Sequence, residues 1–160
     1  MSRRTGEGRV AATLLGGGTA ATLDIVYAIV RQAGRGRSPE WTLQSVASGW
    51  LGEDAFTSGR AGAALGLLSH FAILIVAAGL FVLASRRFPA MRTQALTAGL
   101  AFGVLVFLVM NFVVLPLSAF PFHLTYTPAR LLEGFVSHAV LVGLPIAFAV
   151  RRLASRRGFG

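Results

Sequence analysis

Four long apolar segments constrain this sequence more than any other feature. They run over 10–30, 61–84, 93–115 and 131–150, and together they cover more than half of the 160 residues. An α-helix rises about 1.5 Å per residue, so about 20 apolar residues cross a hydrocarbon layer about 30 Å thick. Because nothing between the segments is long enough to form a second domain, the sequence predicts a single all-α domain over 1–160, a four-helix transmembrane bundle.

The composition agrees with a membrane protein. Hydrophobic residues make up 54% of the chain and charged residues only 13%, which leaves too little polar surface to cover a soluble core. The formal net charge of +9 comes from arginines that flank the apolar segments, so the expected partner is the lipid bilayer and not nucleic acid. The absence of cysteine excludes disulfides and thiolate chemistry.

The arginines also predict an orientation. With four spans both termini lie on one side, and that side carries ten arginines against five on the other. By the positive-inside rule both termini are expected in the cytoplasm. The cluster of Arg31, Arg35 and Arg37 on the opposite side is an argument against this orientation.

The first external loop contains helix signals. Ser38 is a typical N-cap and Pro39 a typical first helical residue, which predicts a short helix over 39–51. Trp41 and Trp50 are residue types that anchor at a membrane interface, so this helix is expected to lie on the membrane surface. An ordinary loop helix packed on the bundle is the alternative. One helical face carries four residues at i, i+3, i+4 and i+7: Leu43, Val46, Ala47 and Trp50.

Several polar residues interrupt the apolar segments at similar depth. Counted from the arginine at the cytoplasmic end of each segment, Asp24, His70 and His138 lie about 22, 24 and 20 Å into the membrane. Asn111 and Glu133 lie slightly further, at about 28 and 27 Å, which places Glu133 at the external interface.

A lone charge inside a membrane costs at least about 2.5–3.5 kcal/mol on insertion scales, so such residues usually face a bundle interior with a partner. We therefore predict a buried polar cluster of Asp24, His70 and His138 with Asn111. His70 is the favoured partner of Asp24, because consecutive helices are usually neighbours. The cluster either fixes the register of the helices or forms a ligand-binding site of Asp24, His70 and His138.

Both histidines follow a glycine by four residues, in GLLSH from Gly66 to His70 and in GFVSH from Gly134 to His138. Residues four apart share a helical face, so each glycine clears space beside an imidazole. That space admits either a neighbouring helix or a cofactor, such as a haem or a divalent metal. No histidine pair has the i, i+4 spacing of a strong metal motif, so no cofactor is the main expectation.

Three segments carry a resemblance to a known family: GRSPEWTLQSVASGWLG, MNFVVLPLS and SHAVLVGLPIA. They resemble an uncharacterised family of small four-helix bacterial inner-membrane proteins, and the likeness extends from the first apolar segment to Pro145. The resemblance implies a bacterial inner membrane. It implies no activity or catalytic residue for this chain.

The functional expectation follows from what the sequence contains. No nucleophile–base pair, phosphate-binding loop or strong metal motif is present, so an enzyme is not expected and no catalytic residue is assigned. The main expectation is a structural or accessory membrane protein, working with a membrane-protein partner or a second copy of itself. A small transporter or proton-linked permease that uses the Asp/His cluster is one alternative, and a haem- or metal-binding electron-transfer protein is another.

Overall fold

The structure, a computed structural model, describes residues 2–157 and the side chains of residues 6–153. Within these residues it consists of helices and connecting loops, with no strand. The elements in chain order are α1 (Ser2–Ala33), α2 (Pro39–Leu51), the 3₁₀ turn η1 (Gly52–Phe56), α3 (Gly59–Arg87), α4 (Ala90–Thr93), α5 (Ala95–Val109), the π-helical η2 (Met110–Val114), α6 (Leu115–Leu117), α7 (Pro128–Ser137), the π-helical η3 (His138–Gly143) and α8 (Leu144–Arg157).

Four continuous helical stretches are long and apolar enough to cross a membrane: Gly6–Ala33, Gly59–Arg87, Ala95–Leu117 and Pro128–Leu153. They agree with the four apolar segments of the sequence to within a few residues. At most 33% of the residues in the apolar part of each stretch are buried inside the protein. Large apolar side chains such as Leu68 and Val76 therefore remain exposed along the helices, as expected of surfaces that contact lipid.

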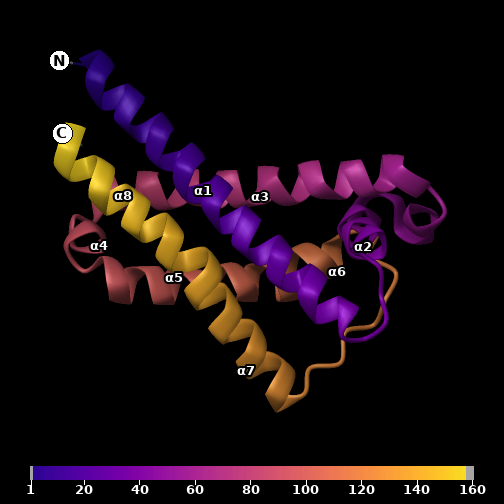
Figure 1. Cartoon of the computed structure of the whole chain (residues 1–160). Coiled ribbons are helices and arrows are strands. Elements are labelled where there is room, and N and C mark those ends of the chain that lie inside the picture. Colours follow the sequence, from indigo (N-terminus) through magenta and orange to yellow (C-terminus); the bar gives the residue numbers. More distant parts are fainter. Residues whose placement is uncertain (1, 158–160) are drawn as a thin grey trace.

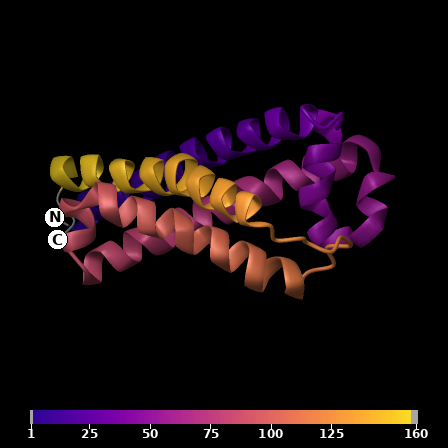
Figure 2. The same cartoon turned by 90° about the horizontal axis from the view of Figure 1, so that it is seen from below.

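The helices form two antiparallel pairs that cross each other (Figure 1). α1 runs beside α8 in one pair, while α3 and α5 are joined through the short α4 in the other. α1 also packs on α3, and α5 packs on η3 and α8. Both termini and α4 lie at one end of the molecule, whereas α2 and the loop over 118–127 lie together at the other end (Figures 1 and 2).

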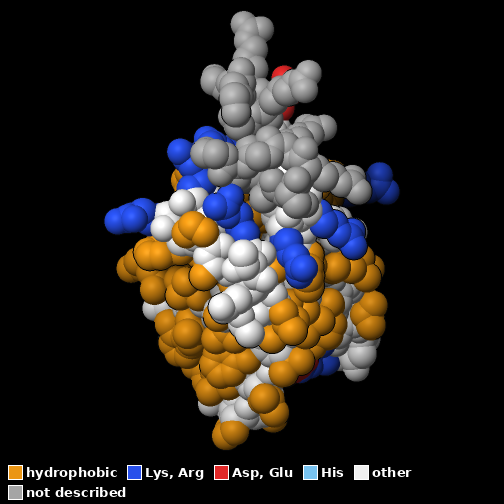
Figure 3. All heavy atoms as spheres, turned by 90° about the vertical axis from the view of Figure 1, so that its left-hand side faces the viewer, with side chains coloured by type: hydrophobic (Ala, Val, Ile, Leu, Met, Phe, Trp, Pro, Cys, Tyr) orange, Lys and Arg blue, Asp and Glu red, His pale blue; other side chains and the backbone are white. Residues whose placement is uncertain are grey.

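Charged and apolar surfaces are separated at the end that holds the termini. Figure 3 shows arginine side chains gathered around this end, with a broad hydrophobic surface next to them. The described arginines there include Arg86, Arg87, Arg151 and Arg152, at the ends of α3 and of the last apolar stretch. Such a belt of cations beside an apolar surface suits the boundary between lipid head groups and hydrocarbon.

Glycines let the pair that contains α5 contact the span of α7, η3 and α8 through the backbones. A β-carbon on Gly143 of η3 would overlap the carbonyl oxygen of Gly99 and lie 2.7 Å from the amide nitrogen of Gly103, both in α5. Only a residue without a side chain fits so close to a backbone, and the Gly-xxx-Gly spacing of Gly99 and Gly103 permits this approach.

Two spans widen into a π-helical turn at the residues of the expected polar cluster. η2 contains Asn111, and η3 begins at His138. Each is followed by a Leu-Pro pair, with Pro116 in α6 and Pro145 in α8. Proline has no amide hydrogen and its ring clashes with the carbonyl four residues earlier, so the preceding turn has to relax. Wide turns of this kind are frequent at functional sites.

α2 has the bounds that its capping residues predict, and most of its buried residues lie off the face of Leu43, Val46, Ala47 and Trp50. The Ser38 hydroxyl accepts the Trp41 amide hydrogen at 3.0 Å, and Pro39 is the first helical residue. Of that apolar face only Ala47 is buried inside the protein, and Trp50 is 71% exposed. The buried residues are instead Thr42, Gln44, Ala47 and Ser48.

The close approach of α2 to α3 explains which residues of α2 are buried. A β-carbon on Gly66 of α3 would overlap the carbonyl oxygen of Leu43, so the two backbones are nearly in contact. Small and hydroxyl-bearing side chains fit such an interface better than large apolar ones. The Gln44 side chain also donates to the Gly59 carbonyl oxygen at 3.1 Å, which satisfies a polar group that would otherwise be buried without a partner.

Candidate functional site

Two adjoining cavities lie in the half of the molecule that holds α2. The first cavity, of about 660 Å³, is open to the outside on one side and is lined mainly by α1, α2, α7 and the loop over 118–127. The second cavity, of about 840 Å³, lies between α2, α3 and the segment from η2 to α6. Seven residues line both, and four of these are the predicted cluster: Asp24, His70, Asn111 and His138. The polar residues of four separate spans therefore meet where the two cavities join.

Asp24 and His70 face each other between α1 and α3. The Asp24 Oδ2 and His70 Nε2 atoms are 3.8 Å apart, and the two side chains are only 15% and 10% exposed. At this separation they attract electrostatically but do not form a hydrogen bond. His70 Nε2 lies 3.1 Å from the Ala21 carbonyl oxygen. Because a carbonyl can only accept, this nitrogen carries a hydrogen and donates it to Ala21.

His70 thus lies beside Asp24 as expected, but it donates its hydrogen bond to the Ala21 carbonyl oxygen and not to Asp24. Ala21 lies three residues before Asp24, on the same face of α1, and its carbonyl competes for the single Nε2 hydrogen. Among the residues whose side chains are described, none donates a hydrogen bond to the Asp24 carboxylate. The Asp24 carboxylate is thus partly exposed to the two cavities, where a ligand or water can supply the donor that the described side chains do not.

His138 turns back onto its own helix. Its Nδ1 atom lies 3.1 Å from the Gly134 carbonyl oxygen and 3.4 Å from the Ser137 hydroxyl. Nδ1 therefore carries the hydrogen, and in a neutral ring Nε2 is left as an acceptor. The ring packs edge-on against Phe107 at a centroid distance of 5.2 Å. The two Gly–Ser–His motifs are therefore used differently, since His70 reaches across to α1.

Asn111 marks the turn that Pro116 disrupts. In η2 the Leu115 amide donates to the Met110 carbonyl, five residues back. The next bond of this pattern would join Pro116 to the Asn111 carbonyl, but proline has no hydrogen to donate. The Tyr126 hydroxyl donates to that carbonyl instead, at 2.8 Å. The Asn111 side chain donates to the Phe107 carbonyl oxygen at 3.0 Å, so it does not reach Asp24.

The sequence did not predict an ion pair that closes one side of the first cavity. Glu133 of α7 accepts two hydrogen bonds from the Arg31 guanidinium and one, at 2.7 Å, from the Tyr27 hydroxyl. Glu133 was expected at the external interface, and it is partly buried in this contact between α1 and α7. The sequence did contain a hint that Arg31 faces the bundle, since Asp24, Tyr27 and Arg31 lie at i, i+3 and i+7 on one face of α1.

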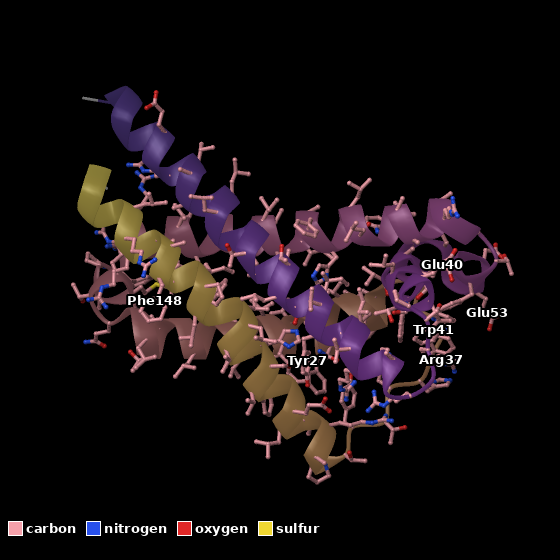
Figure 4. All side chains as sticks on the ribbon, viewed as in Figure 1. Tyr27, Arg37, Glu40, Trp41, Glu53 and Phe148 are labelled. Atoms are coloured by element: carbon pink, nitrogen blue, oxygen red, sulfur yellow. The ribbon has the colours of Figure 1, made fainter. Side chains whose placement is uncertain are left out.

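Aromatic rings and further arginines form the outer wall of the first cavity. Trp41 stacks on Phe56 with ring centroids 5.4 Å apart, and Phe122 from the loop over 118–127 lies 5.4 Å from Phe56. The Arg37 guanidinium lies 4.5 Å from the centre of the Trp41 ring, and both are visible at the α2 end in Figure 4. Tyr27 lies on α1 in the same half, whereas Phe148 of α8 lies toward the termini.

Gly66 and Gly134 were expected to clear space beside the histidines for either a neighbouring helix or a cofactor. A β-carbon on Gly134 would overlap the Phe107 ring, as one on Gly66 would overlap α2. Both spaces are thus filled by neighbouring helices, not open as slots for a flat cofactor. Among the described side chains, no three His, Cys, Asp or Glu residues lie close enough together to hold a metal ion.

No protein-family model, curated protein or solved structure matches this chain. The chemistry of the two cavities is therefore the basis for a functional proposal.

Proposed function

We propose that this chain is a multi-pass membrane protein of the small transporter or permease type, with a proton-linked binding site at Asp24. The observation that carries the proposal is the position of the Asp24 carboxylate, which lies where the two cavities join and accepts no hydrogen bond from the described side chains. Cavities of about 300–1,000 Å³ are typical of small-molecule sites, and both cavities fall within that range.

A purely structural role accounts less well for this arrangement. A polar cluster that only fixes helix register is expected to satisfy its groups with one another and to exclude empty volume. Here His70 donates to Ala21 and His138 donates to Gly134, so both histidines are held by backbone carbonyls and not by Asp24. The carboxylate remains available to a proton or a ligand. Ionisable residues inside membrane proteins are characteristic of proton relays and substrate pathways.

In the proposed mechanism Asp24 is the proton-accepting group. When it is ionised, it attracts a donor or cation in the cavity and is stabilised by His70 at 3.8 Å. When it is protonated, the negative charge at the junction disappears, and a ligand that the charge repelled can pass. His138 offers Nε2 as a second acceptor beside the junction, so a proton can be shared between the two cavities.

The membrane placement is part of the same proposal. The four apolar stretches cross a bacterial inner membrane as one bundle, with both termini in the cytoplasm and α2 on the outer surface. This orientation is supported by the excess of arginines at the termini end and by Trp41 and Trp50 at the α2 end. The resemblance of the sequence to small bacterial inner-membrane proteins supports the choice of membrane.

The proposal is tested by proton flux in vesicles that contain the purified protein and a trapped pH-sensitive dye. Under an imposed pH gradient with the membrane potential clamped, we expect proton entry above that of protein-free vesicles. Asp24→Asn should reduce this entry about tenfold or more, because the amide cannot take up a proton. Asp54→Asn, at an exposed position of η1, is the matched control and should leave it unchanged.

Two results would overturn the proposal. One is equal proton entry through wild-type protein and Asp24→Asn vesicles. The other is wild-type entry no greater than that of protein-free vesicles, together with co-purification in a larger complex, which would favour the accessory role.

A further inference from the structure

Three arginines that line the first cavity form no ion pair with a described carboxylate, although Arg35 lies close enough to Glu133 to attract it. Arg31 is neutralised by Glu133, but Arg35, Arg37 and Arg130 form no ion pair among the described residues. Arg35 contacts the Gln32 side chain at 3.5 Å, and Arg130 donates to the Thr125 carbonyl oxygen at 3.1 Å.

The charge of the first cavity is therefore positive. Four arginines line it against two carboxylates, Asp24 and Glu133, which leaves a formal charge of +2 with the histidines neutral. Besides Arg31, two of these guanidinium groups, Arg35 and Arg37, come from the turn between α1 and α2, and the third, Arg130, comes from the first turn of α7, so exposed arginines from two segments line the outer side of the cavity. Guanidinium groups bind carboxylates and phosphates with two parallel hydrogen bonds, which makes this cavity suited to an anionic group.

The second cavity has the opposite character. No arginine lines it, and much of its wall consists of apolar side chains from α3, η2 and α6, including Ile73, Val113, Val114 and Leu115. Burial of an apolar chain against such a wall is favourable by about 25 cal/mol per Å². Five polar residues and two apolar ones line both cavities, and Val46 and Phe120 provide the apolar side of the junction.

We infer that the ligand of this site is a single-chain amphipathic anion, with a carboxylate or phosphate head among Arg35, Arg37 and Arg130 and an apolar tail in the second cavity. This assignment rests on the proposed function and names its substrate class. An anionic ligand near the junction also favours protonation of Asp24, because an ionised carboxylate there repels an anion that has to pass it. A fatty acid is the simplest ligand of this chemistry.

The inference is tested with a fatty acid that carries a photoreactive diazirine at the end of its chain. The full-length protein is placed in bilayers of neutral lipid, irradiated with the probe, and digested to locate the cross-links by mass spectrometry. We expect cross-links on the wall of the second cavity, in the peptides that contain Ile73 and Val113–Leu115, and loss of these cross-links with excess unlabelled palmitate. The alcohol analogue of the probe, which has no charge, is used in parallel.

Substitutions separate the head site from the tail site. The triple variant Arg35→Gln, Arg37→Gln and Arg130→Gln should weaken labelling by the acid about tenfold and leave labelling by the alcohol unchanged. The matched control replaces three arginines at the opposite end, Arg86→Gln, Arg87→Gln and Arg151→Gln, and should change neither. Ile73→Trp fills the second cavity and should reduce labelling by both probes, with folding checked by size-exclusion chromatography and thermal unfolding.

Several outcomes would contradict the inference. Equal labelling of the two triple variants would exclude the arginine site, and cross-links confined to lipid-facing residues such as Leu68 and Val76 would exclude the cavity. Labelling by a two-chain anionic phospholipid as strong as that by the fatty acid would overturn the single-chain assignment.

The outcome is independent of the proton-flux experiment. Asp24-dependent flux without fatty-acid binding would refute the substrate class and leave the proposed function in place. Fatty-acid binding without Asp24-dependent flux would refute the proposed proton-linked function and leave the fatty-acid site in place.

Discussion

Alanine substitutions at three glycines should change stability in opposite directions. Gly143 faces backbone atoms of α5, namely the Gly99 carbonyl oxygen and the Gly103 amide nitrogen, which a new β-carbon would meet at 2.7 Å or less. Gly18 of α1 has no atom within 4 Å of the position of a β-carbon, apart from the backbone of its own helix. The same chemical change therefore adds a steric clash at one site and none at the other.

The magnitudes follow from two opposing effects. Alanine is favoured over glycine inside a helix by about 0.5–1 kcal/mol, because glycine loses more conformational freedom on folding. Inserting an extra carbon into a packed contact costs about 1–3 kcal/mol, with the upper part of the range expected where the neighbour is backbone that cannot rotate away. We expect Gly18→Ala to stabilise by about 0.5–1 kcal/mol and Gly143→Ala to destabilise by about 1–2 kcal/mol net.

Gly134 provides an intermediate case. The atoms that a β-carbon would meet belong to the Phe107 ring, which can move by side-chain rotation. Gly134→Ala should therefore cost less than Gly143→Ala, about 0–1 kcal/mol net.

Thermal unfolding of the purified variants in one detergent, followed by tryptophan fluorescence, measures this series. For a protein of this size 1 kcal/mol corresponds to about 2–4 °C in Tm. The expected order of Tm is Gly18→Ala, then wild type, Gly134→Ala and Gly143→Ala. A Tm of Gly143→Ala equal to or above that of Gly18→Ala would show that α5 and η3 are not in backbone contact.

Two further substitutions test contacts near the site, both by thermal unfolding. Tyr126→Phe removes the donor to the Asn111 carbonyl and should destabilise by about 1–2 kcal/mol. Pro116→Ala restores an amide donor, so the double variant should lose less than the sum of the single changes, and strict additivity would contradict the account of η2. Glu133→Gln breaks the partly exposed pair with Arg31 and should cost about 1–2 kcal/mol, whereas Glu53→Gln, at an exposed position in η1, should cost nothing measurable. Equal effects of the two changes would argue against the contact between α1 and α7.

The features that the sequence predicted are those with a large local cost or a regular period. The four apolar stretches follow from length and hydropathy alone, and the bounds of α2 follow from Ser38 and Pro39. The contact between Asp24 and His70 followed from depth, because both are counted along helices of fixed rise and neither can face lipid without cost. None of these predictions required knowledge of how the helices cross.

The features that the sequence did not predict depend on how closely two backbones approach. The buried face of α2 carries Thr42 and Ser48 because α2 nearly touches Gly66, a distance that helical periodicity does not contain. Arg31 was counted as a loop charge, so its pairing with Glu133 needed the positions of α1 and α7. The orientation of His138 depends on the Phe107 ring beside Gly134, which lies on another span.

The wide turn before Pro116 lies in the half of the molecule that holds the two cavities. Toward the termini, Phe81, Ile146 and Val150 are fully buried in a core of small and apolar residues, and Gly143 holds α5 against η3. Toward α2, Pro116 widens the helix at Asn111 and the chain leaves the regular hydrogen-bonding pattern. In η2, polar groups that a regular helix would satisfy internally become available to a cavity, whereas η3, which is also π-helical, packs closely on α5 through Gly143. We expect Pro116→Ala to regularise η2 and to shrink the second cavity. Loss of cross-linking by the fatty-acid probe in Pro116→Ala, with the arginines of the first cavity intact, would tie the binding site to this irregular turn, and full retention of cross-linking would separate the two.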